Sequence, residues 1–334
     1  MFQIKIYDVT ARIESNDSGF ESYIRGSFSP SIVESADLDT GRHEDVIIRI
    51  EFQKSGNRMA KEWIEVTEKR NPIVLGSTVR AGEESVYYQY GPYCISVSKE
   101  KGVLEIRSLF QMIRRFRLQK AFHQNRIYDY YQSLMRLAIH YPIFHLLELK
   151  GWSVLHSSLV CFEDNGVLFT GLNGVGKTTT ALSLLPEARI LSDNFVLFNG
   201  ERLFPFPEYI RIPHHVMNFF NLRPTGFRVF GKDQVIMDRD IMKYQPKPAA
   251  IIILKRGEKA SWREVSRDEA IDYIRAADAF THEGHRYSHF SFLSKQMNIR
   301  YPDCDTYEAI LGSFNESIDM IRRKVGGLLG IQYR

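Results

Sequence analysis

Residues 166–185 read GVLFTGLNGVGKTTTALSLL, and this stretch predicts the fold of the second half of the chain. Its centre, GLNGVGKT at 171–178, fits the phosphate-loop pattern G-x-x-x-x-G-K-[ST] at every fixed position. The apolar run before the loop, 166–170, is typical of a buried strand. The residues after it predict a helix from about Lys177 to Leu185 that ends at Pro186. A strand, a glycine-rich loop and a helix in this order are the context that the motif requires.

Each residue type in the loop suits the binding of phosphate groups. Glycines let the backbone turn and approach a phosphate without a Cβ clash. Successive N–H groups then point at phosphate oxygens at the start of a helix. Lys177 can reach the β- and γ-phosphates, and the hydroxyl of Thr178 can ligate Mg²⁺. A turn that merely joins strand to helix has no need of this Lys-Thr pair. We therefore expect ATP and Mg²⁺, with the nucleotide held by Gly171, Asn173, Gly174, Val175, Gly176, Lys177, Thr178 and Thr179.

Two polar residues flank the loop at equal distances along the chain. His156 lies fifteen positions before Gly171, between two predicted strands, and Asp193 lies fifteen positions after Thr178. Asp193 follows a predicted strand, 189–192, at the edge where open α/β sheets place their ligand chemistry. An acid there can hold Mg²⁺ or accept the proton of an attacking hydroxyl. Taken singly, such residues are more often a core histidine and a turn-capping aspartate.

Taken together, these segments resemble the catalytic domain of HPr kinase/phosphorylase, which shares its nucleotide-binding core with PEP carboxykinase. The resemblance is carried by LHSS at 155–158, the loop, and LSDNFV at 191–196, and it covers about residues 150–255. It implies an α/β fold: a P-loop kinase core of this type with a β-rich N-terminal domain. It further implies that Asp193, His156 and Lys177 are catalytic, and that Thr178 and Asp193 hold Mg²⁺.

One position departs from the family pattern. The family has a pair of aspartates where this chain has Asp193 and Asn194. Asparagine does not accept a proton at neutral pH, although it can orient a hydroxyl or a metal-bound water. Glu208 is our candidate for the family's downstream acid, and Arg211 on the same segment could offset γ-phosphate charge.

The resemblance also bears on the phosphate acceptor. The first hundred residues differ from the N-terminal domain of bacterial HPr kinases, and relatives with a different N-terminal half include kinases of ribosomally made peptides. The implied acceptor is therefore a Ser/Thr-type hydroxyl of a peptide or small protein. Two alternatives stay open: a kinase with a small-molecule acceptor, and a nucleotide-binding module with little or no catalysis, which Asn194 favours.

The remaining sequence predicts three parts. Residues 1–108 predict a β-rich domain, because alternating or β-branched runs such as 2–6, 46–52 and 103–106 are separated by turns. Residues 109–150 predict a helical connector, and 151–334 the kinase domain. Within the last part, Asn199-Gly200 predicts a tight hairpin between two strands.

Composition limits the partners and the compartment. The 334 residues are 44% hydrophobic and 25% charged, and 44 Lys+Arg against 40 Asp+Glu leave +4, too little to favour nucleic acid. The longest apolar run, 249–254, is too short to span a membrane and predicts a buried strand. The N-terminus lacks the apolar run of a signal peptide. Three distant cysteines favour a reducing compartment, so we expect a cytoplasmic protein, with a homo-oligomer left open.

Two weaker patterns complete the reading. Basic residues cluster within 114–126, and we prefer a solvated helix face to a docking patch for an acidic partner. His282, His285 and His289 have spacings compatible with Zn²⁺, but Gly284 interrupts a helix there and a polar loop is the preferred interpretation.

Overall fold

The computed structural model describes residues 1–33, 44–54, 78–80, 85–90, 93–100, 103–112, 125–235, 240–279 and 299–333. The described chain divides into two compact units. The first comprises Met1–Lys150 together with Phe227–Phe230. The second comprises Gly151–Gly226 and the described residues within Gly231–His285 and Asn298–Arg334. Within these ranges, no helix combines the length and the apolar character needed to cross a membrane.

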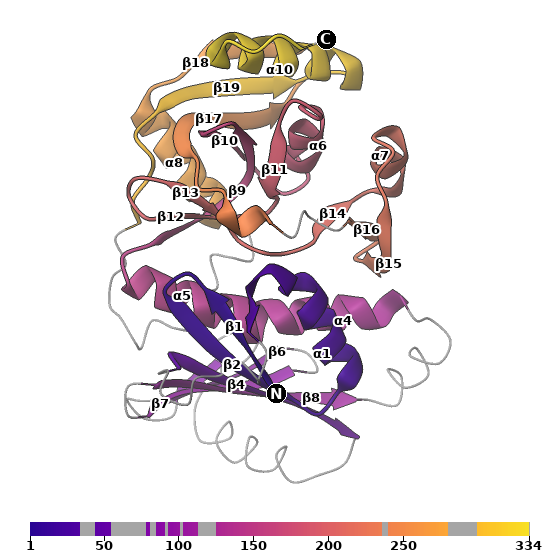
Figure 1. The fold of residues 1–334 in the computed structure, drawn as a ribbon, viewed down its shortest axis with the longest axis vertical. Coiled ribbons are helices and arrows are strands. Elements are labelled where there is room, and N and C mark those ends of the chain that lie inside the picture. Colours follow the sequence, from indigo (N-terminus) through magenta and orange to yellow (C-terminus); the bar gives the residue numbers. More distant parts are fainter. Residues whose placement is uncertain are drawn as a thin grey trace. The chain divides into compact units, whose positions relative to one another are not determined.

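The first unit is built on one mixed sheet. Among the described residues, eight strands have the order β3-β1-β2-β4-β8-β7-β6-β5, and β2, β4 and β8 run parallel to one another (Figure 1). The strands are β1 (Phe2–Ile6), β2 (Val9–Ser15), β3 (Ile32–Val33), β4 (Val46–Lys54), β5 (Thr78–Arg80), β6 (Ser85–Tyr90), β7 (Tyr93–Glu100) and β8 (Val103–Met112). The helical segments are α1 (Ser18–Ser27), η1 (Ser29–Ser31), α4 (Asn125–Met135), the π-helical η3 (Arg136–His140) and α5 (Tyr141–Leu149).

The pleat of the sheet explains which side chains form the core of this unit. Along β4, Val46, Ile48 and Ile50 are buried, while the residues between them are partly exposed. Helix α5 packs on β2, and η3 packs on β4 and β8. The segment that the sequence sets apart as a connector therefore belongs to the first unit: it contributes the last residues of β8 and the helices α4, η3 and α5, of which η3 and α5 pack on the sheet.

The second unit contains a second mixed sheet. Its described strands have the order β13-β12-β9-β10-β17-β19-β18, with β11 also paired to β9. They are β9 (Ser153–Phe162), β10 (Asn165–Thr170), β11 (Arg189–Ser192), β12 (Phe195–Phe198), β13 (Leu203–Pro205), β17 (Lys247–Arg256), β18 (Ser261–Glu264) and β19 (Asp305–Leu311). β10, β17 and β19 are parallel, whereas β9 is antiparallel to β10.

Further elements of the described chain complete the fold. The helical ones are α6 (Lys177–Leu182), α7 (His214–Phe219), η4 (Ile241–Lys243), α8 (Arg267–Ala279) and α10 (Phe314–Leu329). A small sheet of order β14-β16-β15 is formed by Ile210–Ile212, Lys232–Val235 and Pro224–Val229. The architecture as a whole is mixed α/β, as the sequence predicts.

Both faces of the central parallel strands are covered by helices. Val167, Phe169 and Ile252 point into a cluster with residues of α6 and α10. Leu168 and Ile251, one position along, point to the other face and pack with Ile274 of α8. Because alternate side chains are buried on opposite faces, the strand has to be apolar throughout. The expectation of a buried strand at 249–254 is confirmed.

The structure corrects three local expectations. His156 does not lie between two strands; it lies within the single ten-residue strand β9. Helix α6 ends at Leu182 rather than Leu185. The hairpin loop spans four residues, since Phe198 pairs with Leu203, and the Asn199 side chain accepts hydrogen bonds from the backbone of Glu201 and Arg202 at 2.9 and 2.8 Å. Asparagine here stabilises a longer turn by capping it.

Candidate functional site

The phosphate loop connects the end of β10 to the start of α6, and its backbone requires glycine. Gly171 has φ 151°, and a Cβ there would lie 2.7 Å from the carbonyl oxygen of Leu254 on β17. Gly176 has φ 119° and directly precedes α6. Val175 is buried and anchors the loop, whereas residues 172–174 are exposed. The loop is therefore held in place at both ends, while its middle residues are exposed to solvent.

The ammonium group of Lys177 lies against this backbone. The residue is 7% exposed, and Nζ donates hydrogen bonds to the carbonyl oxygens of Gly171 at 2.8 Å and Leu172 at 3.4 Å. Lys177 is the first residue of α6, and its side chain folds back so that the ammonium group lies against the loop. Positive charge and helix N–H groups together favour an anion at this position.

Strand pairing brings the predicted flanking residues to the same end of the sheet. On β9, Ser157 pairs with Thr170, which immediately precedes the loop. On the other edge of β9, His156 pairs with Phe195, and the Ser157 N–H donates to the carbonyl oxygen of Asn194 at 3.1 Å. The His156 segment thus lies between the start of the loop and the Asp193-Asn194 turn.

Asp193 is held in place by its neighbour on β9. The residue is 5% exposed, and Ser158 Oγ lies 3.0 Å from its carbonyl oxygen and 3.2 Å from Oδ1, within reach to donate to either. His156 is equally buried and its ring lies edge-on to Phe195, with centroids 6.0 Å apart. The hydroxyl of Ser158 therefore restricts the orientation of the Asp193 side chain.

The oxygen donors at this end suit a magnesium ion that binds together with phosphate. Thr178 and Asp193 supply a hydroxyl and a carboxylate, and the described residues contain no group of three or more His, Cys, Asp or Glu that could hold a metal, at this end or any other. Mg²⁺ commonly takes one or two protein oxygens and completes its shell with substrate phosphates and water. The residues present fit that mode of binding.

Two cations that the motif search missed come from β17. Lys255 and Arg256 are the last residues of that strand, which runs parallel to β10 and ends beside the loop. A Cβ on Gly176 would lie 3.3 Å from Nη2 of Arg256. Arg256 is exposed, and none of the ion pairs within the described ranges includes it. Their position directly after an apolar run, at the carboxyl end of a parallel strand, is the signal that would have found them.

Lys255, unlike Arg256, is neutralised. Its ammonium forms an ion pair with the buried carboxylate of Glu308, which also accepts a hydrogen bond from Arg263 Nε at 2.8 Å. The Arg263 hydrogen bond is the largest cause that lowers the pKa of Glu308, followed by the contact with Lys255, while burial opposes them. Tyr273 of α8 donates to the carbonyl oxygen of Leu254 at 3.4 Å, and burial raises the pKa of its hydroxyl.

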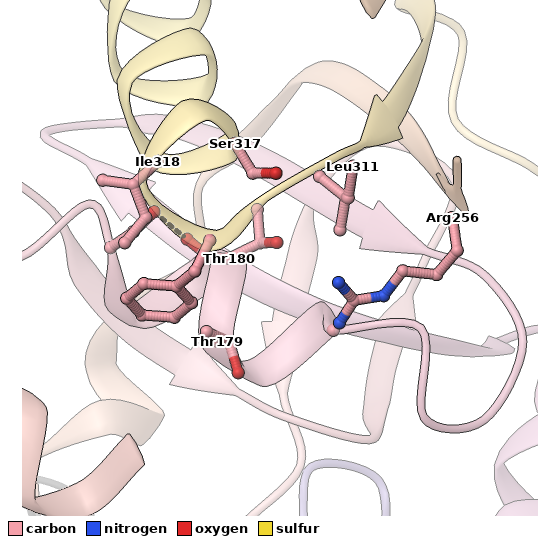
Figure 2. A pocket seen from close by; sticks show the side chains of 9 residues that line it. Thr179, Thr180, Arg256, Leu311, Ser317 and Ile318 are labelled. Carbon is pink, nitrogen blue, oxygen red and sulfur yellow. Dashed lines mark hydrogen bonds between the residues drawn. The ribbon is translucent and has the colours of Figure 1, made fainter. Parts of the chain in front are cut away.

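The other sequence candidates are placed as follows. Glu208 is buried just before β14, and Arg211 lies half-buried on that strand. The three histidines 282, 285 and 289 and the basic residues 114–120 lie outside the described residues. Thr179 lines a hollow beside the loop that Figure 2 shows, together with Thr180 and Arg256.

No protein-family model matches the chain, and no curated protein matches its sequence significantly.

Proposed function

We propose that the second unit is a P-loop kinase core of HPr kinase type that transfers the γ-phosphate of MgATP to a hydroxyl of a peptide or small protein. The loop geometry is the observation that supports this most: Lys177 is folded over a backbone whose glycines leave room for phosphate oxygens. The adjacent guanidinium of Arg256 adds further positive charge for a polyanion.

Each residue has a task in this reaction. Lys177 would neutralise charge on the β- and γ-phosphates. Thr178 and Asp193 would hold Mg²⁺, whose charge would offset that of the phosphate oxygens. The acceptor oxygen forms its bond to the γ-phosphorus in line with the bond that breaks toward the β-phosphate oxygen. Asp193 accepts the proton of that hydroxyl. His156 lies on the neighbouring strand β9. The residues would act in a reducing cytoplasm, in keeping with the free thiols of Cys161 and Cys304.

The first test is nucleotide binding. Lys177→Ala should lower the affinity for MgATP by about 100-fold, because a charged donor to two phosphates is lost. Isothermal titration measures the affinity, and thermal unfolding checks that the variant stays folded. Lys243→Ala, which removes a surface lysine paired with Asp240, is the matched control and should bind as the wild type does. Unchanged affinity in Lys177→Ala would contradict the proposal.

The second test is phosphoryl transfer. The protein is incubated with γ-labelled ATP and a degenerate Ser/Thr peptide library, and the label is located by mass. We expect label in peptides, and Asp193→Asn should lower the rate by about 10²- to 10⁴-fold while MgATP still binds. Label confined to added amino acids and carboxylates would instead identify a small-molecule kinase.

One residue favours a second candidate, a nucleotide-dependent binding module. Asn194 occupies the position of the resembled family's second aspartate, and its side-chain Nδ2 is buried with no hydrogen-bond partner among the described residues. Tight MgATP binding without transfer, together with turnover gained in Asn194→Asp, would support this candidate. Robust transfer by the wild type would exclude it.

A further inference from the structure

A hollow lies beside the phosphate loop. It begins at Gly176 and follows one side of α6 along Thr179, Thr180 and Ser183. The opposite wall is the first part of α10, with Phe314, Ser317 and Ile318, and the ends of β17 and β19 close it with Arg256 and Leu311 (Figure 2). The hollow therefore starts where the bound phosphates would end.

An aromatic pair borders this hollow. Phe314 is 40% exposed and Phe219, at the end of α7, is 60% exposed. Their ring centroids lie 4.9 Å apart at an interplanar angle of 87°, so Phe219 and Phe314 stand edge to face. The ring of Phe220 contacts that of Phe219 edge to face, again with centroids 4.9 Å apart. The ring of Phe314, held by its perpendicular neighbour, can therefore offer a face on which a planar ligand stacks.

The walls between the rings and the loop are polar and cationic. Thr179 and Ser317 bring hydroxyl groups to the hollow, and the Arg256 guanidinium points into it (Figure 2). Among the described residues, no carboxylate pairs with that guanidinium. From the loop outward, the order is thus an anion site, a free cation, hydroxyls and an aromatic surface.

We propose that this hollow binds the nucleoside end of the triphosphate, with the base stacked on Phe314, whose ring Phe219 holds edge to face, and with Arg256 beside the α-phosphate. This rests on the proposed function, because the phosphate loop fixes where the nucleoside begins. A purine is the base class that fits, since its two fused rings cover more of the aromatic surface than a pyrimidine. Stacking of this kind is sequence-tolerant, so ATP and GTP bind with similar affinity.

The test separates the base from the phosphates. Affinities are measured by titration for MgATP and for magnesium tripolyphosphate, which carries the phosphates alone. Phe314→Ala should weaken MgATP binding about tenfold and leave tripolyphosphate binding unchanged. Phe314→Tyr should keep the wild-type affinity, because the ring is retained. Leu328→Ala, at an exposed apolar position near the other end of α10, is the matched control and should change neither affinity.

The outcomes distinguish this inference from the proposed function. If the wild type binds tripolyphosphate as tightly as MgATP, or if Phe314→Ala weakens both equally, the base site is overturned while the phosphate site stands. If the wild type binds neither compound, the phosphate site itself fails and the base site falls with it. A selective loss of MgATP binding in Phe314→Ala supports the inference.

Discussion

Charged side chains have different partners at the two ends of the parallel strands in the second unit. At the amino end of β10, Arg202 pairs with Asp164 at 2.8 Å and donates to the carbonyl oxygen of Gln245 at 2.6 Å. At the carboxyl end, Lys177 lies on backbone carbonyl oxygens, and Arg256 has no acidic partner within the described chain. One sheet therefore has an amino end whose arginine is paired and a carboxyl end where Arg256 is not paired among the described residues; we call the latter the cationic end.

From this difference we expect the charges at the amino end to contribute to stability and those at the carboxyl end to ligand binding. An exposed ion pair such as Arg202–Asp164 contributes at most about 1 kcal/mol to stability and satisfies its own charges. At the carboxyl end, a bound polyanion would pair with the positive charge of Lys177 and Arg256. Substitutions at the two ends should accordingly affect different measurements, and the following predictions are ordered by the size of the expected effect.

The largest contrast is between two glycines at opposite ends of β10. Gly171→Ala places a Cβ 2.7 Å from the backbone carbonyl oxygen of Leu254, so the loop must shift, and MgATP affinity should fall about 100-fold. At Gly166→Ala the Cβ would meet the side chain of Leu203 at 2.8 Å, and the free energy of unfolding should fall by about 1–3 kcal/mol. Titration and urea unfolding measure the two effects. Equal loss of MgATP affinity in both variants would contradict the contrast.

The second contrast is between the two arginines. Arg256→Ala should raise the dissociation constant for MgATP about tenfold, because a charged contact with phosphate is lost, and should hardly change stability. Arg202→Ala should leave nucleotide binding unchanged and cost less than about 1 kcal/mol of stability. The arginine that binds nucleotide should also show the stronger dependence on ionic strength. If Arg202→Ala weakened MgATP binding and Arg256→Ala lowered stability instead, the cationic end would not be the end that binds the ligand.

The smallest effect concerns the pH dependence of stability through Glu308. Because Arg263 and Lys255 lower its pKa in the folded protein, this carboxylate stabilises the fold at neutral pH. The contribution is lost as the pH falls below the ordinary value of 4.5, where the unfolded chain binds the proton first. Glu308→Gln should therefore cost about 1–2 kcal/mol at pH 7, and the deficit should shrink as the pH falls. Urea unfolding at a series of pH values checks it; a constant deficit would rule out the ionic cause.

The strand-loop-helix order around the phosphate loop was predictable because its determinants are local. The loop glycines are required by the backbone angles at Gly171 and Gly176, and the apolar run 249–254 by burial on two faces. Strand and turn boundaries were less predictable. His156 lies inside one long strand because β10, β11 and β12 all pair with β9, and pairing partners from elsewhere in the chain are not visible in a local pattern.

The sequence by itself determined the phosphate loop, its strand and helix, and Lys177 as the charge upon it, because each depends on residues a few positions apart. Only the tertiary structure decided that Arg256 stands beside Gly176, that Ser158 holds Asp193, and that Phe219 meets Phe314. These contacts join segments far apart in the chain, and the order of strands in the sheet sets which segments meet.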